Sequence, residues 1–532
     1  MGQSCAIEGM VQGTVNTLPW EGIMANAALY FVDRHVHEGR GDKVAFREYP
    51  NGRALSYGML AATSDKIAGA FGQVGIAREE RAAMLVLDCI EFPQIFWGAI
   101  KAGVVPVPLN TLLAAPVYDV ILRDSRATIL FISEALYAMV KPVLADNPYL
   151  RQIVVIGDAP AGATSLEAFT TGAKPSAAVE ASDDETAFWL YSSGSTGLPK
   201  GVHHIHSSMQ ATADTYGAHV LKIKEDDVVY SAAKFFFAYG LGNEMSFPMS
   251  VGATAVLFSG RPTPDVVVNI LNTQSPTVFC GVPTLYAAIL AYMDANGVAK
   301  APLHRCISAG EALPEDVGQR WAQMIGVDIL DGVGSTEMLH IFLSNADGDV
   351  IYGTSGTAVP GYEMRLVDDA GNDVPSGEVG ELVVNGASAA SGYWNQREKT
   401  RATFAGVWTH TGDKYEQRSD GRYVYCGRTD DMFKVSGIWV SPFEVESALI
   451  AHPAILEAAV VAALDPEGLE KPKAFVVLNE GVNDDGLAEM LKEHVKDKIG
   501  KWKYPRWIEC VDELPKTATG KIQRFKLRGP DA

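Results

Sequence analysis

The stretch that organises the chain reads Ser192-Ser193-Gly194-Ser195-Thr196-Gly197-Leu198-Pro199-Lys200-Gly201-Val202. A loop of this composition exposes hydroxyls and backbone N–H groups, and its glycines let the backbone approach a bulky anion. Lys200 adds a positive charge suited to phosphate. The apolar run at residues 187–191 predicts a buried strand that leads into the loop. The spacing is not that of a Walker A motif. A flexible linker is the alternative, but the apolar lead-in and the Pro-Lys-Gly ending favour a phosphate-binding loop.

Bulk composition sets the class of protein. The chain has 532 residues, of which 47% are hydrophobic, so more than one domain is expected. A net charge of −20 argues against nucleic acid or an anionic membrane as a partner. The six cysteines are scattered without a Cys-x-x-Cys pair, which argues against a zinc site and for reduced thiols. With no signal-like start and no apolar run of membrane-spanning length, a cytoplasmic enzyme is expected.

The pattern of elements predicts the fold class. Residues 21–180 alternate amphipathic helices (57–75 and 92–102) with apolar strands (81–87, 104–109, 127–132 and 152–156). Residues 202–282 repeat this alternation and further strands follow up to residue 330, which predicts α/β architecture with doubly wound, mainly parallel sheets. Residues 353–428 have short strands and frequent turns, typical of a β-rich subdomain. The last hundred residues read as a compact α+β unit of domain size.

Small residues and carboxylates follow several of these strands. Ligands of open α/β sheets bind beyond such strand ends. One strand is followed by Gly310-Glu311-Ala312, and the next by Asp331-Gly332-Val333-Gly334-Ser335-Thr336-Glu337. Glu337 is a candidate Mg²⁺ ligand together with phosphate oxygens, while Ser335 is also a candidate helix cap. Asp413 is either a turn former or an acceptor for ribose hydroxyls.

Five separate stretches now agree in order: residues 192–201, 334–337, 410–413, 427–430 and 515–521. Together they resemble the adenylate-forming superfamily, which includes acyl-CoA synthetases, peptide-synthetase adenylation domains and firefly luciferase. The resemblance implies a large domain of residues 1–429 and a small mobile domain of residues 430–532, with a hinge at Asp430. It also implies two half-reactions: ATP and a carboxylic acid give an acyl-adenylate and pyrophosphate, and a thiol then displaces AMP.

The resemblance assigns the ATP-binding residues by position. The β- and γ-phosphates are expected at Ser192, Ser193, Gly194, Ser195, Thr196, Gly197 and Lys200. Adenine is expected between Gly310-Glu311-Ala312 and Asp331-Gly332-Val333-Gly334, with Ser335 beside them. Thr336 is expected to reach the α-phosphate, Glu337 to bind Mg²⁺, and Asp413 to take the ribose hydroxyls with Arg428 nearby. Many relatives have Tyr where this chain has Val333, and His where it has Phe237, so stacking and gating by those side chains are not carried over.

The resemblance also assigns two catalytic lysines. Lys521 is expected between the carboxylate and the α-phosphate during adenylation. Rotation at Asp430 would withdraw it and bring Lys434 to face the adenylate. Ser436, Gly437 and Trp439 are then expected on the coenzyme A side of the site.

The acyl pocket of relatives maps here onto an apolar set with one Tyr and one His: Ala238, Tyr239, Ala309, Gly334, His340 and Ile341. No Asp lies between Lys234 and Gly242, so a substrate ammonium would be buried unpaired, and an amino acid is disfavoured. His340 as a plain core residue is the alternative to a pocket role. The run at residues 331–342 resembles benzoate–CoA ligases most closely, which predicts ATP, Mg²⁺, coenzyme A and an aromatic acid as ligands.

Other functions stay open at this point. A ligase for a hydroxy- or aminobenzoate or for a medium-chain acid is the nearest alternative. A luciferase-type oxygenase and a non-catalytic ATP-binding regulator are two further classes, although the Lys521 and Glu337 positions favour catalysis. The sequence does not set the oligomeric state; a homodimer is one expectation.

Overall fold

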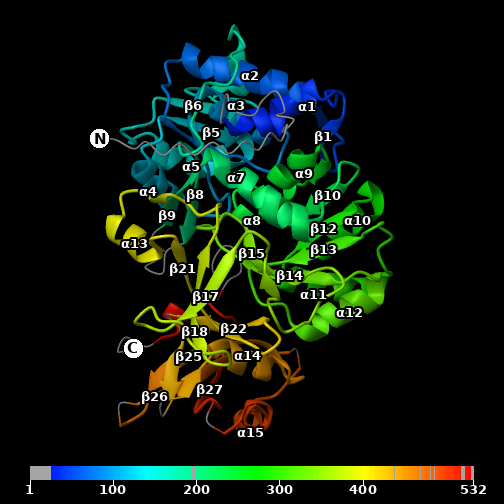
Figure 1. Ribbon diagram of the computed structural model, residues 1–532, viewed down its shortest axis with the longest axis vertical. Helices are drawn as coiled ribbons and strands as arrows, with labels where there is room; N and C mark the ends of the chain where they lie inside the picture. The colour runs from blue at the N-terminus through cyan, green and yellow to red at the C-terminus, as the bar shows by residue number, and fades with distance from the viewer. Residues whose placement is uncertain are drawn as a thin grey trace, which may run out of the picture.

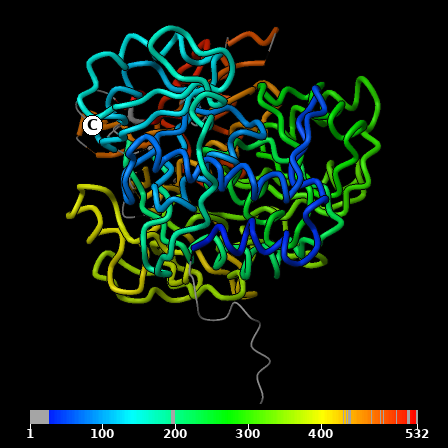
Figure 2. Tube along the Cα trace, turned by 90° about the horizontal axis from the view of Figure 1, so that it is seen from above, coloured from blue at the N-terminus to red at the C-terminus, as the bar shows by residue number. Residues whose placement is uncertain are grey.

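The computed structural model describes residues 26–193, 199–429, 431–435, 438–467, 469–479, 481–484, 486–501, 503–516 and 522–528. It has a large upper body of α/β layers, an antiparallel β unit beneath it, and a small α+β domain at the bottom (Figure 1). Seen from above, the segments of the two α/β sheets lie side by side, with the first helices running across them (Figure 2). Across the described ranges, no helix is both long and apolar enough to cross a membrane.

The smaller α/β sheet is parallel throughout and has helices on both faces. Its strand order is β4 (Val105–Pro108), β3 (Arg81–Leu85), β5 (Ile129–Ser133), β6 (Gln152–Ile156) and β7 (Thr164–Ser165). One face packs on α2 (Tyr57–Gln73), α3 (Glu91–Ala102) and α6 (Leu166–Thr170). The other packs on α4 (Ala115–Ser125) and α5 (Glu134–Leu144). Every residue of β5 is buried, as a strand covered on both faces requires. The doubly wound arrangement is confirmed.

The larger sheet carries the candidate site on one edge. Its order is β16 (Thr357–Ala358), β15 (Ile341–Ser344), β14 (Ile329–Gly334), β13 (Arg305–Ser308), β12 (Val278–Gly281), β10 (Val228–Ser231), β11 (Thr254–Leu257), β1 (Val44–Glu48) and β2 (Ala54–Ser56). The strands from β14 to β1 are parallel, and antiparallel strands close both ends. The carboxyl ends of β10, β12, β13 and β14 therefore meet at one edge, where ligands of such sheets bind.

Helices cover both faces of the larger sheet. On one face lie α10 (Pro264–Gln274), α11 (Pro283–Asn296) and α12 (Glu315–Ile325). On the other lie the π-helix η2 (Ala213–Leu221), the π-helix η3 (Gly242–Ser246) and α9 (Phe247–Val251), preceded by α7 (His206–Thr212) and α8 (Ala238–Leu241). Pro264 and Pro283 stand at the first helical position, where a missing N–H costs nothing.

Two antiparallel units complete the large domain. One joins β17 (Glu363–Val367), β18 (Val379–Asn385), β20 (Phe404–Ala405), β21 (Trp408–Gln417) and β22 (Tyr423–Arg428). The other joins β8 (Thr186–Ser193), β9 (Pro199–Ile205) and β19 (Gly392–Tyr393), followed by α13 (Arg397–Thr403). The β-rich content expected over residues 353–428 is present, but β16 and β19 leave it to pair with other sheets.

The small domain packs below the β-rich unit. Its elements are β23 (Phe433–Val435), β24 (Ile438–Val440), α14 (Pro442–Ile450), β25 (Ile455–Leu464), β26 (Glu470–Leu478), α15 (Leu487–Ile499), β27 (Trp507–Cys510) and the 3₁₀ turn η4 (Arg524–Lys526). Helices α14 and α15 share an apolar core with the β25-β26-β27 sheet. Contact with the large domain runs through α14 and β22, where the rings of Tyr425 and Phe443 meet at 5.5 Å.

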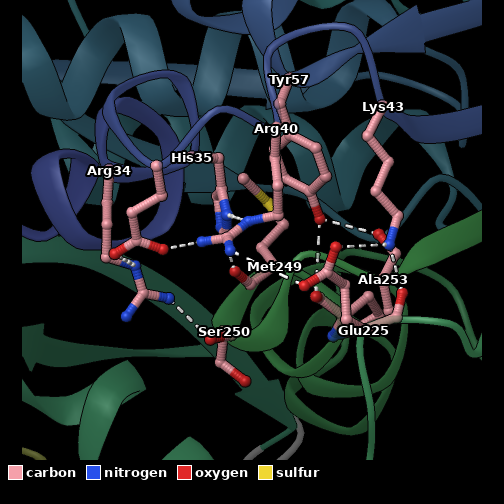
Figure 3. Close-up of polar contacts among 11 residues, drawn as sticks. Arg34, His35, Arg40, Lys43, Tyr57, Glu225, Met249, Ser250 and Ala253 are labelled. Atoms are coloured by element: carbon pink, nitrogen blue, oxygen red, sulfur yellow. Dashed lines mark hydrogen bonds and ion pairs between the residues drawn. The ribbon is translucent and has the colours of Figure 1, made fainter.

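A buried histidine links α1 to α9, one of the helices that cover the large sheet. The π-helix η1 (Leu29–Asp33) runs into α1 (Arg34–His37), and His35 of α1 is fully buried. Its Nδ1 accepts from Arg40 Nε at 2.8 Å, so its Nε2 carries the proton and donates to the carbonyl of Met249 in α9 at 2.5 Å (Figure 3). The Tyr57 ring lies 4.2 Å away. Burial lowers the pKa of His35 to about 3.

This histidine predicts part of the pH dependence of stability. Its folded pKa lies below the unfolded value, so its contribution is present above about pH 6.5 and is lost as the pH falls toward 3. We expect His35→Gln to make the free energy of unfolding less steep in pH, by about 1.4 kcal/mol per pH unit between pH 6 and 4. Urea unfolding at a series of pH values measures the slope. The exposed His37, replaced in the same way, should keep the wild-type slope; equal slopes in all three proteins would contradict the prediction.

Candidate active site

The strands on either side of the predicted phosphate loop pair with each other in antiparallel fashion. Strands β8 and β9 pair with Ser192 opposite Lys200 and Ser193 opposite Pro199. Gly194, Ser195, Thr196 and Gly197 lie outside the described residues. Beneath the hairpin, the Trp189 and His203 rings stack at 4.3 Å with planes 10° apart, and the Trp394 ring lies 4.9 Å from Trp189. Gly201 of β9 lies against the Trp189 and Tyr191 rings and Trp394.

Lys200 and Glu337 meet at a tyrosine. The Lys200 ammonium lies 3.5 Å from Glu337 Oε1. Tyr393 donates its hydroxyl proton to that same oxygen at 2.8 Å and lies 3.3 Å from Lys200 Nζ. The structure thus joins two residues predicted separately from the sequence. It adds Tyr393, which the sequence reasoning missed; the only signal was a Gly-Tyr-Trp run among turns.

The second group of predicted ATP residues lies at the ends of β13 and β14. Gly310, with φ near 97°, and Glu311 and Ala312 follow β13. Residues 331–334 lie within β14, which runs further than the predicted strand. Asp331 is buried, and burial raises its pKa to about 8. That carboxyl is therefore mostly neutral at pH 7.

Residues 335–340 form a tight turn between β14 and β15. The Ser335 hydroxyl accepts from Met338 N at 3.1 Å, as a cap would, but no helix follows. The Thr336 carbonyl faces His204 Nε2 at 2.9 Å. A Cβ on Gly334 would lie 2.4 Å from the carbonyl oxygen of His340, so only glycine fits the closure of this turn. The turn places Glu337 and His340 within three residues of each other.

Asp413 and Arg428 lie side by side on neighbouring strands. They are direct partners in the β21–β22 ladder. Arg428 donates through the same nitrogen to the Thr411 carbonyl at 2.9 Å and to Asp413 Oδ1 at 3.0 Å. The contact holds the Asp413 carboxylate in one orientation. A carboxylate that accepts hydrogen bonds from two neighbouring hydroxyls needs such a fixed orientation.

The predicted acyl residues gather around one ring cluster. His340 lies 5.6 Å from the Tyr239 ring, 5.0 Å from Tyr216 and 4.5 Å from Phe247. Ile341 and Ala309 belong to the same apolar cluster, against which Tyr239 packs, and Ala238 directly precedes Tyr239. Burial lowers the pKa of His340 to about 3, so its ring is neutral. The cluster packs flat, uncharged rings next to the Glu337 turn; His340, Tyr216 and Phe247 are buried, and Tyr239 is half-buried.

The other predicted residues belong to the small domain. Asp430, Ser436, Gly437 and Lys521 lie outside the described residues. Lys434 and Trp439 are ladder partners of the β23–β24 hairpin. The sequence reasoning missed a buried pair nearby: Arg524 Nε and an Arg524 terminal nitrogen donate to Glu446 Oε1 and Oε2 at 3.0 and 2.6 Å.

Comparison with known proteins shows the family of the chain. Residues 32–394 match the model of the AMP-binding enzyme family, and residues 444–521 that of the AMP-binding enzyme C-terminal domain. A 4-hydroxybenzoate–CoA/benzoate–CoA ligase of Rhodopseudomonas palustris is 53% identical over 507 residues, covering 94% of each chain.

Solved structures show the same likeness. A benzoate CoA ligase from Burkholderia xenovorans aligns with a TM-score of 0.86 and 48% identity, over 95% of this chain and 99% of that one. An anthranilate CoA ligase in complex with anthranoyl-AMP aligns with a TM-score of 0.89 and 41% identity, over 95% and 97%. The chain therefore belongs to the AMP-binding enzyme family of the adenylate-forming superfamily and is an AMP-forming acid–CoA ligase.

Proposed function

We propose that this enzyme joins benzoate to coenzyme A through a benzoyl-adenylate. One observation carries the proposal: a single short turn holds the candidate magnesium carboxylate, Glu337, and three residues later the ring wall at His340. The His340 ring is buried and backs the half-buried ring of Tyr239, which is the part of this wall that an acid would meet. A flat aromatic acid lying on Tyr239 would present its carboxylate beside the phosphates of ATP. Relatives named as benzoate and anthranilate ligases support this choice of acid.

The first half-reaction needs positive charge at the phosphates. A carboxylate oxygen of the acid attacks the α-phosphorus, and pyrophosphate leaves. Glu337 fits a Mg²⁺ that arrives with ATP, since Mg²⁺ takes one or two protein carboxylates and completes its shell with phosphate oxygens and water. Bound there, Mg²⁺ would neutralise phosphate charge. Lys200 would bind the β- and γ-phosphates, and Asp413 would accept from the ribose hydroxyls. Lys521 would place its charge at the α-phosphate, where negative charge concentrates.

In the second half-reaction the thiol of coenzyme A has to reach the acyl carbonyl, through the space that Lys521 would occupy during adenylation. The coenzyme A sulfur attacks the acyl carbonyl, and AMP leaves with the bonding electrons. We propose that the small domain turns about Asp430, which removes Lys521 and presents Lys434 with Ser436, Gly437 and Trp439. The limited contact between α14 and β22 is compatible with such a turn.

A panel of acids tests the substrate assignment. We expect benzoate to give the highest kcat/KM for AMP release with coenzyme A, with hydroxy- and aminobenzoates next and medium-chain acids lower. An added polar group on a ring that lies against these mainly apolar walls loses hydration, which benzoate itself does not have to give up. A hydroxybenzoate or a medium-chain acid as the best substrate would replace benzoate in the assignment and leave the ligase chemistry intact.

Replacing Tyr239 tests the acyl wall. Its hydroxyl points at the carbonyl oxygens of Gly281 (3.0 Å) and Ile307 (3.2 Å), which fixes the ring against the strand ends. We expect Tyr239→Ala to lower kcat/KM for benzoate by about 10²-fold, the cost of losing an aromatic wall. The KM for ATP should change less than twofold. Tyr239→Phe keeps the ring and should keep the order of acids; a variant whose ATP KM moved while selectivity stayed would disprove the pocket.

A further inference from the structure

Tyr393 stands at a junction of three elements. As part of β19 it pairs with Val202 of β9, two residues beyond Lys200. Its backbone N–H donates to Thr400 Oγ1 of α13 at 3.1 Å. Its side chain reaches the turn after β14, and only 7% of the residue is exposed. These two contacts of the Tyr393 backbone, with Val202 and with the Thr400 hydroxyl, fix the direction in which its side chain points.

The hydroxyl uses both its donor and its acceptor capacity. It donates to Glu337 Oε1 at 2.8 Å. Its oxygen lies 3.3 Å from Lys200 Nζ, which has only protons to give, so here it accepts. The same ammonium also lies 4.4 Å from the centre of the Tyr393 ring, within cation–π range. One side chain thus holds both members of the Lys200–Glu337 pair.

That pair has to separate when MgATP binds. Lys200 is needed at the phosphates and Glu337 at the metal, yet at 3.5 Å they neutralise each other. In the described part of the chain, both contacts to the Glu337 carboxylate fall on Oε1, so Oε2 is the oxygen that we expect to meet a cation. A neutral donor that keeps Glu337 in place lets Lys200 move to the phosphates without freeing the carboxylate to follow it.

We propose that Tyr393 is a positioning residue for nucleotide binding: its hydroxyl orients Glu337 toward the metal of MgATP and releases Lys200 to the phosphates. The proposal rests on the function proposed above for Glu337 and Lys200. It gives Tyr393 a part in the first half-reaction only, because attack by coenzyme A follows the departure of pyrophosphate and its metal.

The test compares Tyr393→Phe with a matched control. Tyr352→Phe also removes a tyrosine–carboxylate hydrogen bond, from Tyr352 to Asp328 Oδ1 at 2.8 Å. Asp328 precedes β14, at the opposite end of that strand from the site. We expect Tyr393→Phe to raise the calorimetric Kd of MgATP, measured without acid or coenzyme A, by about 10-fold, the loss of one hydrogen bond to a charged group. The KM for benzoate and the rate of coenzyme A attack on supplied benzoyl-adenylate should stay unchanged, and Tyr352→Phe should match wild type throughout.

A double-mutant cycle shows whether Tyr393 acts through Glu337. If it does, Tyr393→Phe should change the MgATP Kd less than twofold in a Glu337→Gln background, because interacting positions are not additive. An unchanged Kd in Tyr393→Phe, an equal loss in both half-reactions, or full additivity in the cycle would each overturn the proposal. A wild-type enzyme that binds MgATP but activates no aromatic acid would overturn the substrate assignment alone, with the Kd comparison still deciding the role of Tyr393.

Discussion

Replacing Lys521 by Ala is expected to slow formation of the acyl-adenylate by about 10³-fold, equivalent to about 4 kcal/mol of transition-state stabilisation. As the carboxylate attacks the α-phosphorus, two anionic groups meet, and negative charge concentrates on the phosphate oxygens. An ammonium between them offsets that charge more strongly in the transition state than when the two anions are apart. The loss should therefore fall on kcat for adenylation, with a smaller change in the KM for ATP. Acid-dependent exchange between pyrophosphate and ATP measures it.

Two comparisons make this prediction specific. Attack of coenzyme A on supplied benzoyl-adenylate should keep its wild-type rate in Lys521→Ala, because the proposed turn of the small domain would take the lysine out of the site before this step. Lys516→Ala removes a lysine from the same tail, one that pairs at the surface with Glu457. It should leave both half-reactions unchanged. An equal loss in both half-reactions after the Lys521 change would show that this residue serves the fold or the nucleotide in general.

The elements of the fold could be predicted because their signals are local. The strands at residues 129–133 and 152–156 are apolar runs between helices, and burial on both faces of a parallel sheet requires that composition. Helix α2 begins where Ser56 accepts from Met59 N, a capping signal readable from the sequence. The predicted end of the strand β14 was less accurate, because small residues such as Gly332 and Gly334 are typical of loops. They are in fact the residues that allow the close approach of β15.

Candidate site residues could be named from the sequence where they stand in a local motif, as Glu337, Asp413 and Lys200 do. The position of Tyr393 beside Lys200 and Glu337 could not be predicted, since it comes from a ladder between β9 and β19, nearly two hundred positions apart in the chain. Aromatic residues near turns are common in cores, and no local pattern separates this one from them. The same holds for Glu446 and Arg524, which become partners only when the tail folds back onto α14.

The buried pair of Glu446 and Arg524 leads to the second large prediction. Glu446 has a side chain only 6% exposed, and the guanidinium meets its carboxylate through two hydrogen bonds. Glu446 Oε1 also accepts from the N–H of Val460 in β25 at 2.7 Å. Removing the carboxylate leaves a largely buried guanidinium and a buried N–H without this acceptor. Losing one partner of a buried pair costs about 3–5 kcal/mol, several times more than a surface pair.

We therefore expect Glu446→Ala to destabilise the small domain by about 3–5 kcal/mol. We expect Arg524, three residues beyond Lys521, to help hold the tail on this domain; it also pairs with Asp431 at 3.5 Å. Adenylation should accordingly fall by about 10²-fold or more, toward the level of Lys521→Ala, while the large domain keeps its affinity for MgATP. Thermal unfolding and limited proteolysis measure the stability of the small domain, and exchange between pyrophosphate and ATP measures the rate of adenylation. Glu457→Ala breaks only the exposed pair with Lys516 and should alter neither. If Glu446→Ala lost stability but kept its wild-type rate of adenylation, the prediction would be wrong. Lys521 would then reach the nucleotide without the contact between the tail and α14.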